Sequence, residues 1–198
     1  MTHGGRAVSA ALVVLTLAAV MWALEIIDFA AGGALDTFGI QPRDVGDLPH
    51  IFTAPFMHGG FDHLMGNTVP FLVLGFLAAF RGIAKFFAMS LIVIVVGGLG
   101  VWFTSPGNTL GSSILIFGFF GYLLGRGLFE RRMVDIVIAL LVVVFYGTLI
   151  FGVLPSDPGI SWQGHLFGLI GGVIASWVLR RRDGARPAAS PAPPPYGY

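Results

Sequence analysis

Long apolar stretches separated by short polar connections dominate this chain of 198 residues. None alternates polar and apolar positions as a half-buried strand does, and each is close to the roughly 20 residues that a helix needs to cross a bilayer. The pattern predicts an all-α membrane protein, a six-transmembrane-helix bundle in one domain of residues 1–182. We expect helices at about residues 8–30, 62–80, 84–103, 110–129, 134–154 and 159–180. Residues 31–57 form a long apolar connection, and the Pro- and Ala-rich residues 183–198 are expected to form a disordered tail.

Composition narrows the class of protein further. Apolar residues make up 56% of the chain and charged residues only 11%, whereas a soluble domain has roughly 25% charged residues. A soluble globular protein is therefore excluded, and the apolar excess also excludes disorder. The chain has no cysteine, which excludes disulfides and thiolate sites, and its net charge of +1 is too small for a nucleic-acid-binding surface.

The first apolar stretch has two interpretations. Because this stretch lies near residue 1, it could also be a signal peptide. However, the stretch continues through Glu25, Ile26, Ile27 and Asp28 without a clear small-residue cleavage site. This continuation favours a retained first helix.

The basic residues predict the orientation of the helices. With the N-terminus inside, ten of the eleven Lys and Arg residues fall on the inner side and only Arg43 falls outside. Inner loops of membrane proteins carry such an excess, so we expect a multi-pass protein of the cell membrane with both termini in the cytoplasm. The ten inner residues are Arg6, Arg81, Lys85, Arg126, Arg131, Arg132, Arg180, Arg181, Arg182 and Arg186.

Polar side chains gather at the outer ends of the second, fourth and sixth predicted helices. Polar residues inside membrane spans are unfavourable, and they are therefore candidates for function. In the predicted orientation all three helices enter from outside, so their first residues share one depth. The residues of this layer are His58, His63, Asn67, Ser112, Ser113, Ser161, Gln163 and His165.

A serine and a histidine in one layer indicate nucleophilic catalysis, because a serine needs an adjacent base. Glycines at small-xxx-small spacing, Gly121–Gly125 and Gly168–Gly172, favour contact between the fourth and sixth helices. Such contact would bring Ser113 within reach of His165. No acidic residue lies near His165 in this layer, so a Ser–His dyad is favoured over a triad.

Two other interpretations of these residues stay open. Each polar side chain, taken singly, is more simply explained as a hydrogen-bonding contact between helices, although several groups at one depth favour a site. His58 and His63 could bind a metal, but no carboxylate at a clear spacing completes such a site. No metal is therefore expected.

In order and spacing these residues resemble the rhomboid intramembrane serine proteases. Three motifs carry the resemblance: His58, His63 and Asn67 on the second helix; Gly111-Ser112-Ser113, then Phe117, Gly118, Gly121 and Tyr122, on the fourth; and Gly164-His165, then Gly168 and Gly172, on the sixth. Each motif is modestly specific, but their conjunction is highly specific. The match covers nearly the whole membrane core.

The resemblance implies a site and a reaction. Ser113 would be the nucleophile and His165 the general base in the cleavage of transmembrane or juxtamembrane segments. His63 and Asn67 would stabilise the oxyanion together with the backbone N–H of Ser113. The partners implied are membrane-protein substrates with a transmembrane helix and the lipid bilayer, and no cofactor or nucleic acid is implied.

The remaining motif residues include one departure from the family. The resemblance implies that His58 and Gly111 support the site. Ile114 stands where the family usually has glycine after the serine. The bulkier side chain is expected to alter the contact between the fourth and sixth helices or to narrow the approach of substrate. This departure leaves open a catalytically inactive rhomboid-like protein that binds membrane clients. A small transporter is a weaker alternative, because the third and fifth helices carry few polar residues.

The orientation is testable with reporter fusions. A reporter fused after Tyr198 is expected to read as cytoplasmic, because the basic residues lie on the side of the C-terminus. A matched fusion after Gly107, in the predicted outer loop, is expected to read as external. An external signal from the fusion after Tyr198 would contradict both the orientation and the common depth of the polar layer.

Overall fold

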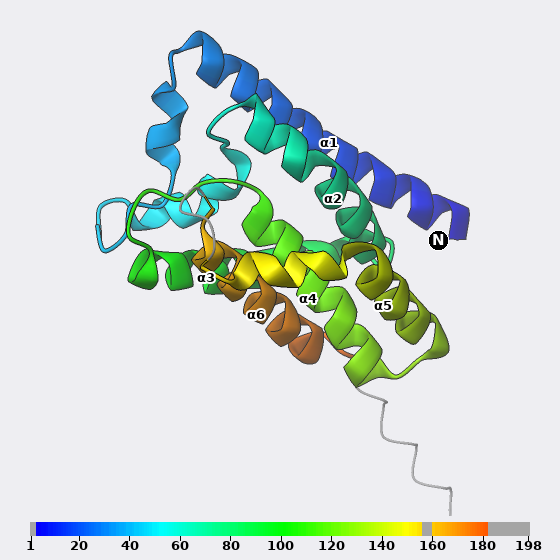
Figure 1. The fold of residues 1–198 in the computed structure, drawn as a ribbon. Coiled ribbons are helices and arrows are strands. Elements are labelled where there is room, and N and C mark those ends of the chain that lie inside the picture. Colours follow the sequence, from blue (N-terminus) through cyan, green and yellow to red (C-terminus); the bar gives the residue numbers. More distant parts are fainter. Residues whose placement is uncertain (1–2, 156–159, 182–198) are drawn as a thin grey trace, which may run out of the picture.

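The computed structural model describes residues 3–155 and 160–181 of the chain. Within these residues the chain forms six α-helices and four short 3-10 segments (Figure 1). The predicted tail of residues 183–198 lies outside the described residues. In chain order the elements are α1 (His3–Ala30), η1 (Ala34–Phe38), η2 (Leu48–Phe52), η3 (Ala54–Phe56), α2 (Phe61–Ala79), α3 (Ile83–Thr104), α4 (Ser113–Glu130), α5 (Met133–Tyr146), η4 (Gly147–Val153) and α6 (Trp162–Val178).

The helices have the lengths that a membrane bundle needs. Of the described helices, five are long and apolar enough to cross a membrane, namely α1 to α4 and α5 continued through η4 to Val153. The sixth, α6, has 17 residues and is about 25 Å long at 1.5 Å per residue. The prediction of an all-α membrane bundle is thus confirmed, and the chain is a multi-pass membrane protein.

Several helix ends differ from the predicted ranges, among them the start of α1 at His3 instead of about residue 8, and the start of α4 has a local physical cause. The helix α4 begins at Ser113 because Gly111 has a φ of +125°, a conformation that an α-helix cannot contain. The helix α5 ends at Tyr146, and the chain then tightens into the 3-10 segment η4. The segment η4 still reaches the end of the bundle at which α2, α4 and α6 begin, which we call the entry end.

The centre of the bundle is formed by α3, α4 and α6, and α4 is the most buried of them. Small residues let the backbones of α4 and α6 touch. A Cβ atom added at Gly172 would overlap the backbone oxygen of Gly118, and one added at Gly168 would overlap the backbone oxygen of Ile114. Because lipid tails are apolar, burying apolar side chains between helices gives little stabilisation in a membrane. Close packing of this kind therefore holds membrane helices together.

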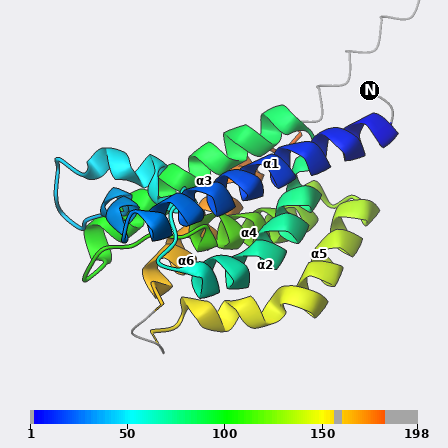
Figure 2. The same cartoon turned by 90° about the horizontal axis from the view of Figure 1, so that it is seen from above.

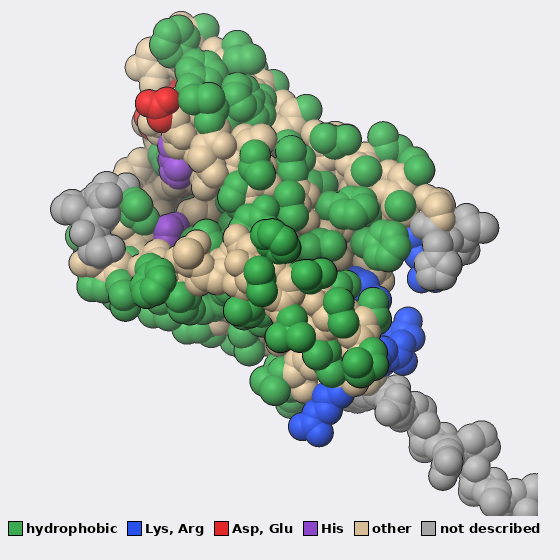
Figure 3. Space-filling view, turned by 45° about the vertical axis from the view of Figure 1, so that its right-hand side comes forward, with side chains coloured by type: hydrophobic (Ala, Val, Ile, Leu, Met, Phe, Trp, Pro, Cys, Tyr) green, Lys and Arg blue, Asp and Glu red, His purple; other side chains and the backbone are tan. Residues whose placement is uncertain are grey.

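The other helices lie around this centre. The helix α1 packs beside α2, and Figure 2 shows α5 with η4 along one edge of the bundle. Of the residues of α5, all of which the structure describes, only Asp135 and Val142 are buried. The outer faces carry large exposed apolar side chains, which cover most of the surface in Figure 3. Such a surface fits a lipid environment.

The connection between α1 and α2 is tied to the loop that leads into α4. Ile40 and Thr109 exchange two backbone hydrogen bonds, at 2.8 and 3.1 Å, and the Gly111 N–H donates to the Ala54 carbonyl at 2.9 Å. Ile51 packs against Gly98 of α3, where an added Cβ would lie 2.6 Å from the Ile51 Cβ. The backbone just before Ser113 is therefore held from outside the helices.

An ion-pair cluster joins the helices at the opposite end, which we call the arginine end. Arg126 of α4 is 4% exposed and pairs with Asp135 and Glu130 at 3.1 Å each, while Arg81, just beyond α2, reaches Asp135 at 3.0 Å. Arg126 also donates to the Tyr122 hydroxyl at 3.2 Å. The sequence pattern indicates only the orientation at Arg81 and Arg126, and it does not predict this cluster. Figure 3 shows Lys and Arg side chains gathered at this end.

The glycine contact between α4 and α6 can be tested by adding single methyl groups. Gly172→Ala is expected to lower the stability by about 1–3 kcal/mol, because its Cβ meets backbone rather than a side chain that can move. The matched control is Gly66→Ala in α2, where an added Cβ meets no atom within 4 Å. That variant is expected to keep or raise the stability by up to about 1 kcal/mol. Unfolding in detergent micelles measures both, and equal losses would contradict the contact.

Candidate active site

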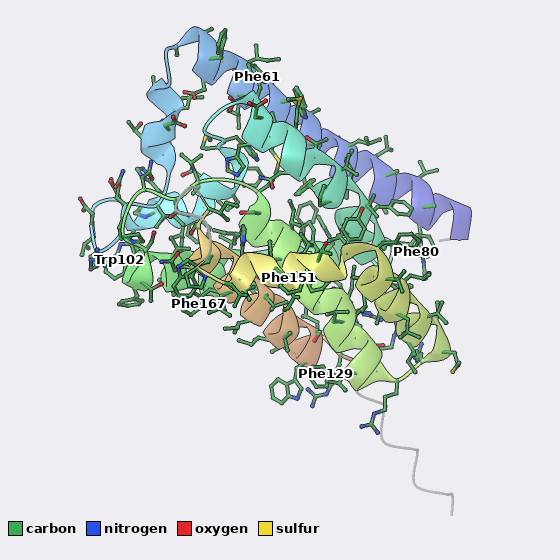
Figure 4. All side chains as sticks on the ribbon, in the orientation of Figure 1. Phe61, Phe80, Trp102, Phe129, Phe151 and Phe167 are labelled. Carbon is green, nitrogen blue, oxygen red and sulfur yellow. The ribbon has the colours of Figure 1, made fainter. Side chains whose placement is uncertain are left out.

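A cavity of about 780 Å³ opens at the entry end of the bundle. It is lined by residues of α2, of the loop before α4, and of the first turns of α4 and α6. Figure 3 shows histidine side chains exposed in a hollow on this face, away from the Lys and Arg side chains. In Figure 4, Phe61 and Phe80 mark the two ends of α2, and Phe61 lies at the entry end of the bundle. Ser113, His165, His63 and Asn67 all line this cavity.

The two adjacent serines at the start of α4 have different surroundings. Ser113 is half-buried and lines both this cavity and a second one of about 240 Å³ beside Pro70 and Gly152. Ser112 is 1% exposed, and its hydroxyl lies 3.1 Å from Nε2 of His58. Ser113 is therefore the serine that faces open space.

His165 is held on two sides. Its ring stacks on the Phe117 ring with 4.0 Å between centroids and 7° between planes. Its Nδ1 lies 2.8 Å from the carbonyl oxygen of Gly152 in η4. Among the described residues there is no hydrogen bond between Ser113 and His165, so their pairing stays a prediction, although both line the same two cavities.

His63 and Asn67 converge on the backbone before Ser113. A Cβ added at Gly111 would lie 2.6 Å from Cε1 of His63 and 3.7 Å from Nδ2 of Asn67. Gly111 thus allows the loop to pass close to both side chains. The Nδ2 atom of Asn67 is buried and has no hydrogen-bond partner among the described residues. An unpaired buried donor is unfavourable by about 1–3 kcal/mol, so this one is available to an acceptor in the cavity.

His58 lies behind the site rather than in its cavity. It is 2% exposed, its ring meets that of His63 edge-on with 5.2 Å between centroids, and its Nε2 accepts the Ser112 backbone N–H at 3.3 Å. Burial, together with the neighbouring His63, lowers the pKa of His58 to about 4. His58 is therefore neutral at neutral pH, which suits an acceptor for the Ser112 N–H.

The carboxylates of α1 lie near His58 and not near His165. Glu25 and Asp28 are 4% and 6% exposed, and they line a small cleft with Asp36 and His58. Within the described residues, no three His, Asp or Glu side chains are arranged to hold a metal ion.

Ile114 is seated between helices and not in the cavity. Its side chain is 1% exposed, and it lies against Gly97 of α3 and Gly164 of α6, while Gly168 of α6 meets the Ile114 backbone. A Cβ at Gly97 would lie 2.7 Å from its Cγ2, and one at Gly164 would lie 3.1 Å from its Cγ1. The described lining of the cavity includes Ser113 but not Ile114. The Ile114 side chain therefore packs where α4 meets α3 and α6, outside the described cavity lining, and its effect on the helix contact and on substrate approach stays a prediction.

One group at the site, the backbone carbonyl of Gly152, could not be predicted from the sequence. The Gly152 carbonyl faces the candidate base, but a backbone carbonyl leaves no mark on the residue type. Phe117 belongs to the motif of the fourth helix, but the sequence does not predict that its ring stacks on His165.

Comparisons with known proteins agree with these motifs. A model of the Rhomboid domain matches residues 45–182. An uncharacterized protein of Mycobacterium tuberculosis is 40% identical over 176 residues, covering 84% of this chain and 73% of that protein. The putative rhomboid protease YdcA of Bacillus subtilis is 30% identical over 146 residues, covering 71% of this chain and 72% of YdcA. The rhomboid protease GluP of the same organism is 30% identical over 171 residues, covering 79% of this chain but 33% of GluP. On these grounds the chain belongs to the rhomboid family.

Proposed function

We propose that this protein is an intramembrane serine endopeptidase that cleaves transmembrane or juxtamembrane segments of other membrane proteins. The observation that carries the proposal is the convergence of Ser113, His165, His63 and Asn67, from three helices, on one cavity. A serine, an imidazole and hydrogen-bond donors around open space are the parts that acyl transfer needs. The matches to rhomboid proteases of Bacillus subtilis support the same reaction.

In this proposal Ser113 attacks the scissile carbonyl. Its Oγ forms a bond to the carbonyl carbon while its proton passes to Nε2 of His165. When the intermediate collapses, the C–N bond breaks and His165 returns the proton to the leaving amine. Water then enters from the open side of the cavity and hydrolyses the acyl-enzyme by the same steps, with His165 again acting as the base.

Three donors are placed to stabilise the oxyanion in this mechanism. Ser113 is the first residue of α4, so its backbone N–H has no partner within the helix. The positive end of the α4 dipole also favours negative charge at this point. Asn67 contributes its unpaired Nδ2, and His63 lines the cavity beside it. Donors aimed at developing charge are usually the largest single contribution to catalysis.

The proposed nucleophile is tested by two serine variants. Ser113→Ala is expected to abolish cleavage, because loss of a catalytic serine costs roughly 10⁶-fold in kcat in a well-studied protease. Ser112→Ala is expected to keep much of the activity and to lose about 1 kcal/mol of stability with its contact to His58. The purified proteins are incubated with a panel of single-span membrane proteins, and cut sites are mapped by mass spectrometry.

A fluorophosphonate probe gives a readout that needs no known substrate. Labelling at Ser113, and its loss in Ser113→Ala, would support the proposal. An active Ser113→Ala variant alongside an inactive Ser112→Ala variant would identify Ser112 as the nucleophile instead. If neither serine is labelled and no substrate is cut, the proposal fails and a catalytically inactive member of the family is favoured.

The role of Asn67 is tested by comparison with its neighbour. Asn67→Ala is expected to lower kcat by up to about 10²–10³-fold, the loss seen when one oxyanion donor is removed, with little change in melting temperature. The control is Thr68→Val, because Thr68 accepts a hydrogen bond from Trp22 of α1 at 3.1 Å instead of facing the cavity. That variant is expected to lose stability and to keep kcat. If activity in Asn67→Ala falls only in proportion to stability, Asn67 is a contact between helices.

A further inference from the structure

The candidate base has a hydrogen-bond partner that is not a side chain. Nδ1 of His165 lies 2.8 Å from the carbonyl oxygen of Gly152, and Gly152 belongs to η4, thirteen residues before the histidine. A carbonyl oxygen can only accept a hydrogen bond. The proton of the neutral imidazole therefore resides on Nδ1, and Nε2 keeps the lone pair that a general base requires.

Close packing around the ring fixes this arrangement. Phe117 lies parallel to the imidazole at 4.0 Å, so the ring cannot tilt toward α4. A Cβ added at Gly152 would lie 2.9 Å from Cζ of Phe117 and 3.0 Å from Nδ1 of His165. Any side chain at position 152 must therefore push the carbonyl, the phenyl ring or the imidazole out of place.

We propose that the backbone carbonyl of Gly152 orients His165 in the way that a carboxylate orients the histidine of a Ser–His–Asp triad. The carbonyl accepts the Nδ1–H bond, selects the tautomer with a free Nε2, and stabilises the imidazolium that forms when Ser113 gives up its proton. This inference rests on the proposed function, and it makes Gly152 a positioning residue. No carboxylate of the described residues lines the cavity beside His165, so the carbonyl occupies the position that an acid would take.

The placement of η4 follows from how α5 is attached to the bundle. The helix α5 is anchored at the arginine end, where Asp135 pairs with Arg81 and Arg126. Along the rest of its length only Val142 is buried, among residues that are all described. In Figure 2 the segment η4 lies along the outer edge of the bundle, and Figure 4 labels its residue Phe151. The base thus keeps this orientation while η4, which packs on the core through Leu149, lies against α6.

The test combines two glycine variants of η4 with NMR of the histidine rings. Gly152→Ala places a methyl group against His165, whereas Gly147→Ala has only an ordinary contact, 3.7 Å to Val143. In protein labelled with ¹⁵N-histidine, the two ring nitrogens report which of them carries the proton, and His165→Gln identifies the His165 signals. The rate of fluorophosphonate labelling at Ser113, and kcat and KM with a substrate from the panel, measure the chemical consequence.

We expect wild-type His165 and the Gly147→Ala variant to carry the proton on Nδ1 and to react alike. Gly152→Ala is expected to show a mixture of tautomers and a kcat and labelling rate lower by about ten- to a hundredfold, as for a lost hydrogen bond to a charged group, with KM and melting temperature nearly unchanged. A wild-type proton on Nε2, or an unchanged rate in Gly152→Ala, overturns the inference.

A second variant decides the matter if Gly152→Ala does not fold. Replacing Val153 by its α-hydroxy acid turns the Gly152 carbonyl into an ester, which is a weaker acceptor of the same shape. This variant is expected to react about two- to tenfold more slowly, as for a weakened neutral hydrogen bond, and an unchanged rate and tautomer overturn the inference. If the wild-type protein neither cleaves nor is labelled, the proposed function fails, and the tautomer of His165 still tests the role of Gly152.

Discussion

The rest of the structure depends on the backbone contact between α4 and α6. At Gly118 opposite Gly172, and at Ile114 opposite Gly168, the two helices approach so closely that a single methyl group would overlap a backbone oxygen. In a bilayer, lipid tails are as apolar as leucine, so helices gain stability from close packing instead of from burial. This contact brings the first turn of α4, with Ser113, beside the first turn of α6, with His165.

Two sets of polar contacts hold the outer helices against this pair, one at each end of the bundle. At the arginine end, Asp135 receives Arg81 and Arg126, which links the end of α2 to α4 and α5. A buried cluster of this kind specifies which helix ends meet, and removing one partner would leave a buried charge unpaired. At the entry end, backbone hydrogen bonds tie the connection between α1 and α2 to the loop before α4. The helices of the site are thus positioned from both ends, whereas α5 is fixed mainly at one.

Much of the bundle, and the candidate residues of its site, could be predicted from the sequence because both follow from spacing. A run of apolar residues gives a span, and His63 and Asn67, four residues apart, share one helix face. The Arg81–Asp135 pair and the hydrogen bonds that tie residues 31–57 to the loop before α4 could not be predicted, because both join segments distant in the sequence. The partner of His165 was hidden for a different reason, since any residue carries a carbonyl. From the sequence, only the Gly-x-Ser motif favours Ser113 over Ser112 as the nucleophile. In the structure, Ser112 is also buried against His58.

The effect of Ile114, which departs from the family pattern, depends on the residues that its side chain contacts. Beside a catalytic serine, a bulky residue in place of glycine suggests an obstructed site. Two glycines, Gly97 on α3 and Gly164 on α6, leave a space at this point, and the Ile114 side chain fills it. Because packed interiors leave few voids larger than a water molecule, the larger residue on α4 and the glycines opposite form one compensated unit. Ile114 thus belongs to the packing of α4 between α3 and α6, and it is not among the described residues that line the cavity faced by Ser113.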